Sequence, residues 1–306
     1  MLYYFRKVIL IALTLLLTPF LVILAAALLL LNLVQLAMRF RRRPVQESGA
    51  PPAKLASIIV LNWNGKDLLA QGLSSIMEAV RVDGRPHEIV VVDNGSTDGS
   101  AEFVHASFPG VRVLSLPKNL GFAGGNNAGV RAARHEIVVL LNNDMIVDSG
   151  FLKPLLEGFQ PQTFSVSSQI FLQDPAARRE ETGKTMAVFR RGMIDYSHLK
   201  IDKSPVRPCY PVFWAGGGSS AFHRERFLLL GGFSEIYSPA YVEDTDLSYQ
   251  AWKTGWEVLL APSSLVYHKH RATSSRRFDS SHLQTLIQRN QFLFIWKNIQ
   301  GWRLLL

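Results

Sequence analysis

The chain has 306 residues, of which 48% are hydrophobic, and it carries a net charge of +9 and a single cysteine. This length accommodates a membrane segment together with one large domain or two small ones, and we predict one domain. The lone Cys209 excludes an internal disulfide and a cysteine-based metal site, so any metal is held by oxygen and imidazole ligands.

A long apolar stretch near the N-terminus, residues 8–38, contains no charged side chain. At about 1.5 Å per residue, a helix of that length exceeds a hydrocarbon core of about 30 Å, so we predict a membrane segment rather than a shorter signal peptide. Four arginines follow within 39–43, and the positive-inside rule places the downstream chain in the cytoplasm. Pro19 would kink a helix in this stretch, so both a single span and a re-entrant hairpin are compatible with the sequence. Both topologies put the downstream domain on the same side of the membrane.

The rest of the chain divides by composition. We predict a membrane anchor with a basic flank at 1–43, a proline-bearing linker at 44–54, a globular domain at 55–270, and an amphipathic helix within 271–306 that lies on the membrane interface. Arginines cluster at 178–179, 190–191 and 271–277, which favours anionic lipid headgroups or a phosphate-bearing substrate, with generic surface charge as the alternative. No aromatic pattern of RNA recognition is present, so we expect no nucleic-acid partner.

Short β-branched runs alternate with helix-like segments after the linker. The predicted strands are 57–61, 88–92, 111–115, 137–141, 165–171 and 257–260, and the predicted helices are 66–80, 100–107, 126–134, 224–230, 247–253 and 281–302. Residues 175–211 show weak periodicity and predict an inserted segment. The alternation predicts an α/β fold with a doubly wound, mostly parallel sheet.

Three apolar runs, at 89–93, 138–144 and 239–246, end in carboxylates. Parallel strands present their carboxyl ends to a shared crevice where ligands bind. Acids delivered to that crevice can contact a nucleobase, a metal ion and a reacting hydroxyl group.

Each of these acids also has a simpler explanation. Asp93 either belongs to a polar turn or accepts a hydrogen bond from a base N–H. Asp144 either caps the next element or holds a metal together with His268. One carboxylate, one imidazole and two diphosphate oxygens suit Mn²⁺ or Mg²⁺, and the nitrogen ligand favours Mn²⁺. The acids at 243–246 complement a helix dipole or supply a general base.

A glycine-rich segment at 121–129 fails the dinucleotide-binding fingerprint, because Ala123 and Asn126 occupy two of its glycine positions. No phosphate-binding loop of the GxxxxGK type is present. The glycines therefore indicate that the backbone closely approaches either a ligand or a neighbouring strand, and Asn126 and Asn127 are possible helix caps.

Taken in order, these motifs resemble the family 2 glycosyltransferases, with the rhamnosyltransferase and galactofuranosyltransferase-like branch the nearest fit. The resemblance rests on SIIVLNWNG at 57–65, VVDNGSTD at 91–98, NLGFAGGNNAG at 119–129, LLNND at 140–144, EDTDLS at 243–248, and His268. It implies a GT-A fold, an inverting mechanism and a nucleotide-diphosphate-sugar donor.

The resemblance also implies roles for individual residues. Asp93 would contact the nucleobase, Asp144 would coordinate a divalent metal (Mn²⁺ or Mg²⁺) with His268, and Asp244 would be the catalytic base. The nucleotide-binding set would also include Asn62, Asn94, Gly125, Asn126 and Asn143, and the acceptor side would hold Glu243, Asp246 and Trp214. The triplet Asn142-Asn143-Asp144 is less charged than the stricter pattern with aspartate at both ends.

The membrane segment extends this expectation to the acceptor. A tethered domain favours a lipid-linked or other glycan acceptor at the membrane surface, with membrane lipids as partners. Two alternatives remain at this stage, a sugar-1-phosphate nucleotidyltransferase and a catalytically silent membrane-bound scaffold. The first is disfavoured because Lys66 is the only basic residue near the loop after the first strand, and the second by the complete set of acids.

Overall fold

The computed structural model describes residues 13–20, 22–24, 26–27, 30, 54–172, 180–190, 193–199, 207–268 and 280–299. It divides into two units, residues 1–50 and 51–306. The described residues of the first unit are helical and exposed. Over the described part of the chain, no helix combines the length and apolarity needed to cross a membrane. Most of the predicted membrane run, the linker before Lys54 and most of the arginine clusters fall outside these residues.

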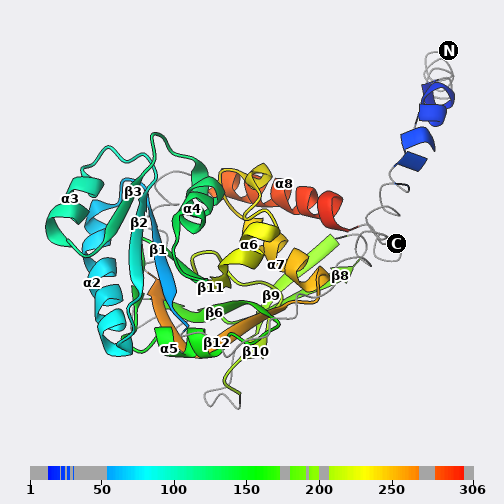
Figure 1. Cartoon of the computed structure of the whole chain (residues 1–306). Helices are drawn as coiled ribbons and strands as arrows, with labels where there is room; N and C mark the ends of the chain where they lie inside the picture. Colours follow the sequence, from blue (N-terminus) through cyan, green and yellow to red (C-terminus); the bar gives the residue numbers. More distant parts are fainter. Residues whose placement is uncertain are drawn as a thin grey trace. The chain divides into compact units, whose positions relative to one another are not determined.

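The second unit is built on a ten-stranded sheet with the path β10-β12-β6-β11-β4-β1-β2-β3, to which β5 and β7 add at β12 and β6 (Figure 1). The strands are β1 (Ala56–Asn62), β2 (Glu88–Asp93), β3 (Arg112–Ser115), β4 (Ile137–Asn142), β5 (Met145–Val147), β6 (Thr163–Leu172), β7 (Glu180–Thr182), β8 (Lys184–Arg190), β9 (Met193–Leu199), β10 (Tyr210–Pro211), β11 (Ser219–His223) and β12 (Glu257–His268). The helices are α2 (Lys66–Asp83), α3 (Ser100–Ser107), α4 (Gly121–Ala132), α5 (Leu152–Glu157), α6 (Arg224–Leu229), α7 (Glu243–Lys253) and α8 (Ser280–Asn298), with a 3₁₀ turn η1 (Glu235–Tyr237).

The prediction of a mostly parallel sheet holds in part, and β12 also pairs with β6 in parallel. Strands β3, β2, β1 and β4 are parallel, whereas β11 runs antiparallel to both β4 and β6, and β5 and β10 run antiparallel to β12. The sheet is therefore mixed. Strand periodicity carries no information on strand direction, and the regular strand–helix alternation that dictates parallel pairing ends after β4.

The sheet has a hydrophobic cluster on each face. Along β1, Ile58 and Val60 point into the cluster with α2 and α5, and Ile59 points into the cluster with α4, α6 and α7. Helix α4 lies so close to the sheet that a Cβ at Gly129 would stand only 2.6 Å from Ile59 Cγ2. Of the two alternatives for the glycine-rich segment, close approach of the backbone to a neighbouring strand therefore explains Gly129.

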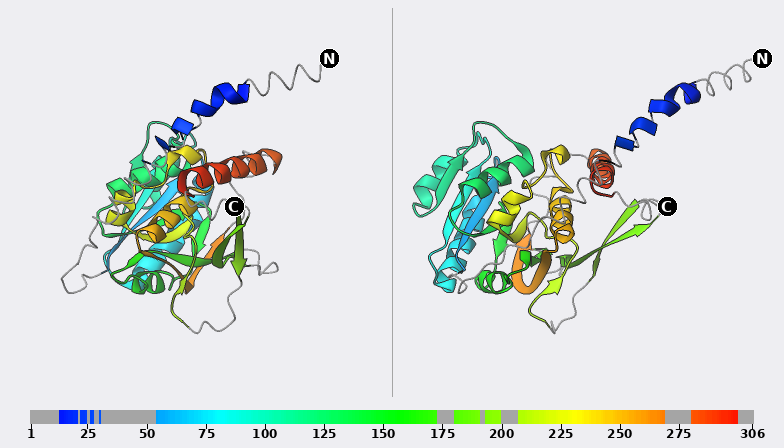
Figure 2. Two further views of the ribbon diagram at one scale, coloured as in Figure 1. Left: turned by 90° about the vertical axis from the view of Figure 1, so that its right-hand side faces the viewer. Right: turned by 45° about the vertical axis from the view of Figure 1, so that its right-hand side comes forward.

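Three local features differ from the sequence prediction. The inserted segment contains an antiparallel hairpin, β8–β9, which Figure 2 shows standing away from the main sheet. Helix α4 begins at Gly121 instead of 126, and α7 begins at Glu243 instead of 247. As a result, residues 121–129 of the glycine-rich motif lie within α4, and the acidic cluster 243–246, which we predict to open a helix, forms the first turn of α7.

Helix α8 packs against the rest of the second unit through Phe294 and Ile295, which join a third cluster with Tyr237, Val242 and the following Ile299. Its opposite face exposes Phe292 (46%) and Trp296 (75%), whose rings lie 6.3 Å apart. The helix thus has a buried face toward α7 and an exposed aromatic pair.

Candidate active site

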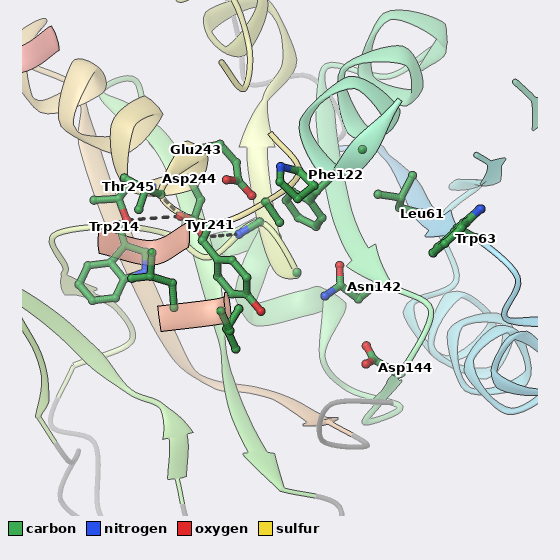
Figure 3. Close-up of a pocket in the computed structure, with 18 of the residues that line it drawn as sticks. Leu61, Trp63, Phe122, Asn142, Asp144, Trp214, Tyr241, Glu243, Asp244 and Thr245 are labelled. Atoms are coloured by element: carbon green, nitrogen blue, oxygen red, sulfur yellow. Dashed lines mark hydrogen bonds between the residues drawn. The ribbon is translucent and has the colours of Figure 1, made fainter. Parts of the chain in front are cut away.

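A cavity of about 740 Å³ opens at the carboxyl ends of β1 and β4. Its lining comes from the end of β1 (Leu61, Trp63), the turns at 94 and 119–122, the end of β4 (Asn142, Asn143, Asp144), the 214–218 segment, β9 (Tyr196, His198), the 239–245 segment, His268, and α8 (Leu283, Ile287, Gln291). Figure 3 shows Leu61 and Trp63 at one end and Trp214 with Asp244 at the other, with Asn142 and Asp144 between them. This volume and the convergent polar groups fit a small-molecule site.

Asparagines tie together the strand ends at one end of the cavity. Asn62 Oδ1 accepts from Asn143 Nδ2 at 2.8 Å, which joins the ends of β1 and β4. Asn94 donates to the Gly121 carbonyl at 3.0 Å and accepts from the Leu120 N–H at 2.9 Å. Asn94 therefore fixes the turn that leads into α4.

Four residues of the predicted nucleotide-binding set do not line the cavity, namely Asn62, described above, and Asp93, Asn126 and Gly125. Asp93 is buried at the end of β2, and its Oδ1 has no hydrogen-bond partner within the described ranges. Asn126 is likewise buried, donating to the Phe122 carbonyl at 3.1 Å. A Cβ on Gly125 would stand 2.5 Å from Leu61 Cδ1, so this glycine lets α4 approach β1.

Asp144 and His268 meet although 124 residues separate them. Strand β12 pairs with β5 so that His268 lies opposite Met145, and this register brings His268 Nε2 to 3.2 Å from Asp144 Oδ2. Asp144 Oδ1 is buried and, in the described structure, lacks a hydrogen-bond partner. Among the residues described, no cluster of three or more His, Cys, Asp or Glu could hold a metal ion. Any cation at this pair would need further ligands from substrate.

The acids of α7 face the cavity from the other side. Asp244 Oδ2 accepts from the Gly217 N–H at 3.2 Å, and Asp244 Oδ1 accepts from the Thr245 N–H at 2.7 Å. The helix starts directly after Tyr241 and Val242, whose φ angles of 78° and 81° are left-handed. Such a conformation costs roughly 1–2 kcal/mol for each non-glycine residue, so the surrounding contacts have to hold it in place.

Burial changes the protonation of this acidic pair. Burial, together with the adjacent Asp244 carboxylate, raises the pKa of Glu243 to about 8. Burial also raises the pKa of Asp244, although backbone N–H groups oppose this shift by stabilising the ionised carboxylate. Near neutral pH the pair therefore tends to retain one proton, and Asp244, which receives the hydrogen bonds, is the better placed to be ionised.

The raised pKa of Glu243 makes stability depend on pH. The folded protein holds this proton between the ordinary pKa of 4.5 and about 8, so the free energy of unfolding falls as the pH rises through that range. We expect the Tm of the wild type, measured relative to Glu243→Gln, to decline from pH 5 to pH 8, because the variant cannot ionise. Exposed Glu102→Gln is the control and should show a constant difference. A pH-independent difference for Glu243→Gln would disprove the raised pKa.

Asp246 has a different environment from its neighbours. It is 0% exposed, does not line the cavity, and accepts from Lys297 Nζ at 2.6 Å and from Asn298 Nδ2 at 2.5 Å. These contacts attach α7 to α8. Trp214 does line the cavity, where its ring meets Tyr196 edge-on at a centroid distance of 5.5 Å.

Several lining residues were not predicted. Trp63 follows the first strand directly, and an aromatic ring at a strand end was the available signal. Tyr196 and His198 alternate along β9, a signal that is visible only once 193–199 is recognised as a strand. Nothing local to α8 indicates that Gln291 reaches the cavity.

Comparison with known proteins identifies the chain. The model of the family "Glycosyl transferase family 2" matches residues 57–224. The chain belongs to this family. The cavity described above is the candidate active site of this glycosyltransferase.

One relative of the glycosyltransferase is the N-acetylglucosaminyl-diphospho-decaprenol L-rhamnosyltransferase of Mycobacterium tuberculosis. It is 27% identical over 267 residues, covering 80% of this chain and 85% of the relative. Polypeptide N-acetylgalactosaminyltransferase 8 of Drosophila melanogaster is 26% identical over 76% of this chain, but the match covers only 41% of that protein.

Solved structures share the GT-A fold. GalNAc-T7 with UDP, GalNAc and Mn²⁺ aligns with a TM-score of 0.59 at 17% identity, covering 84% of this chain and 60% of that one. The mannosyltransferase PcManGT of Pyrobaculum calidifontis, in complex with GDP-Man and Mn²⁺, aligns with a TM-score of 0.54 at 17% identity, covering 89% and 72%. The predicted GT-A fold is thereby confirmed.

Proposed function

We propose that this glycosyltransferase moves a sugar from a nucleotide-diphosphate donor to a hydroxyl group of a lipid-linked saccharide, with inversion at the anomeric carbon and Asp244 as general base. The observation that carries the proposal is that Asp244 and the Asp144–His268 pair line one cavity from opposite sides. A base and a site for the leaving diphosphate would thus share one space.

In the proposed reaction, a carboxylate oxygen of Asp244 takes the proton of the acceptor hydroxyl while the hydroxyl oxygen forms a bond to the anomeric carbon. The bond from the anomeric carbon to the diphosphate oxygen breaks in the same displacement, and no protein nucleophile takes part. The N–H groups of Gly217 and Thr245 hold the carboxylate in place. Glu243, protonated beside it, adds no second negative charge.

Asp144 and His268 would hold a divalent cation, Mn²⁺ or Mg²⁺. The buried Asp144 Oδ1, which has no partner among the described residues, and the adjacent imidazole fit such an ion. When bound, the ion would neutralise charge on the leaving diphosphate, whose oxygens would complete its coordination. Two neighbouring folds were solved with Mn²⁺, which supports this assignment.

The end of the cavity at Leu61 and Trp63 is the proposed nucleotide side. Asn62 and Asn143 would shape it through the hydrogen bond between them, and Asn94 through its bonds with the Gly121 carbonyl and the Leu120 N–H. Asp93, Gly125 and Asn126 would act from behind the lining, and the unmatched Asp93 Oδ1 is an acceptor suited to a base N–H. Glu243 and Trp214 would lie on the acceptor side, and Asp246 would support the base by holding α7.

We further propose that residues 1–43 anchor the enzyme in the cytoplasmic membrane, that 44–54 are a linker, and that the domain from residue 55 faces the cytoplasm. The uncharged run at 8–38 and the arginines after it support this topology. The exposed pair Phe292 and Trp296 on α8 supports contact with membrane lipids within 271–306. The decaprenol-linked acceptor named for the mycobacterial relative supports a lipid-linked acceptor here.

The test uses the full chain in detergent micelles with Mn²⁺ and a panel of nucleotide sugars that includes a nucleoside-diphospho-rhamnose. Release of nucleoside diphosphate is measured with and without a synthetic prenyl-diphospho-N-acetylglucosamine. We expect one donor to be consumed, with release stimulated at least about tenfold by the lipid because the tethered site raises the effective concentration of membrane-bound acceptor.

Other outcomes would replace the proposal. Equal stimulation by a free oligosaccharide would contradict a lipid-linked acceptor. Pyrophosphate-dependent formation of nucleotide sugar would indicate a nucleotidyltransferase. No turnover and no nucleotide binding across the panel would favour a scaffold.

A further inference from the structure

Helix α8 carries a buried asparagine that contacts the segment leading to the acids of α7. Asn290 is 0% exposed, and its amide nitrogen lies 2.9 Å from the Tyr237 carbonyl, 3.0 Å from that of Ala240 and 2.9 Å from that of Tyr241. The partners are 49 to 53 residues away along the chain, so this is a tertiary contact and not a helix cap.

The amide orientation of Asn290 is fixed by its other end. Its Oδ1 accepts from Nε and Nη2 of Arg289, and the same Nη2 donates to the Ser238 carbonyl at 2.6 Å. The amide nitrogen has two hydrogens for three carbonyl oxygens, so at least one bond is shared. A side chain without a donor here would leave these three carbonyls without the amide that binds them.

The contacted segment is the one that requires support. Tyr241 and Val242 hold left-handed φ angles, and Glu243 and Asp244 follow them immediately. Relaxation of these two residues to ordinary φ angles would redirect the start of α7. The same face of α8 holds Asp246 through Lys297 and Asn298, so α7 is fixed both before and after Asp244.

We propose that Asn290 is a positioning residue for the transfer reaction: through the carbonyls of 237–241 it holds the strained entry to α7, and thereby Asp244, at the reacting position. This inference rests on the proposed function of Asp244. The side chain itself does not line the cavity, whereas its neighbour Gln291 does.

The test compares Asn290→Ala, which removes the donor, and Asn290→Asp, which places negatively charged oxygen against the three carbonyls, with Leu286→Ala. Leu286 is buried on the same helix, so its truncation is a control for lost packing without loss of these bonds. Exposed Gln288→Ala controls for substitution on α8 as such. For each full-chain variant, kcat, the Kd of the nucleoside diphosphate product and Tm are measured, together with hydrogen exchange of 238–246.

We expect kcat to fall about 10²-fold in Asn290→Ala and further in Asn290→Asp, because misplacement by about 1 Å has this effect, while Kd stays within about twofold. Hydrogen exchange of the amides at 241–246 should accelerate in both Asn290 variants. When variants with an equal loss of Tm are compared, this acceleration should exceed that in Leu286→Ala. The proposal is overturned if the Asn290 variants match Leu286→Ala in kcat, or if exchange at 241–246 is unchanged. An inactive wild type with the expected exchange response would instead count against the proposed function alone.

Discussion

We expect Asp244→Asn to lower kcat by about 10²- to 10⁴-fold, the range that general base catalysis contributes. The asparagine side chain keeps nearly the same shape, and its single oxygen can still accept from the Thr245 N–H, although the bond from the Gly217 N–H to the other carboxylate oxygen is lost. The start of α7 should therefore stay close to its place. It cannot take up a proton from the acceptor. The measurement is steady-state kinetics of the full chain with the donor identified in the panel, together with the Kd of the nucleoside diphosphate.

The pattern of constants matters as much as their size. A fall in kcat with unchanged Kd means that an interaction made only in the transition state has been lost. Exposed Asp195→Asn on β9 makes the same chemical change outside the cavity lining and should leave kcat unchanged. If Asp244→Asn retains normal transfer, another group is the base.

Asp144→Ala should have the second large effect, on metal-dependent turnover. A cation that stabilises a leaving group contributes several kcal/mol, so we expect a loss of at least about 10²-fold in kcat at limiting Mn²⁺. His268→Ala should act in the same direction. Because both side chains would hold one ion, the double variant should lose much less than the product of the single losses.

Two measurements check this assignment. Activity is titrated with Mn²⁺ after EDTA treatment, and Mn²⁺ binding is followed by electron paramagnetic resonance with UDP and GDP present, which gives a readout independent of turnover. Exposed His105→Ala is the control for His268→Ala and should bind Mn²⁺ like the wild type. An Asp144→Ala protein with a wild-type Mn²⁺ response would place the metal elsewhere.

The half of the sheet formed by β1 to β4 could be predicted from sequence because its signals are local. The β-branched runs at β1, β2 and β4 are buried on both faces, and each ends in polar residues that reach the same edge of the sheet. The second half could not be predicted in the same way. The direction of β11 between β4 and β6, and the hairpin β8–β9, depend on pairings that leave no local periodicity.

The candidate site shows the same division. Asp144 and Asp244 were recognisable as acids at the ends of apolar runs, and the structure brings both to one cavity. The environment of Asp246 was not predictable, because its partners Lys297 and Asn298 lie more than fifty residues away on α8. Asn290 also carries no signal of its own, since an asparagine in an amphipathic helix is ordinarily a solvent-facing residue.

The anomeric configuration of the transferred sugar tests the central claim most directly. The product formed by the full chain from the active donor is isolated, and the configuration at its anomeric carbon is determined by NMR and compared with that of the donor. A single displacement assisted by Asp244 predicts the opposite configuration. Retention of the donor's configuration would contradict it, because retention requires a second displacement or a different mechanism in which Asp244 is not the base.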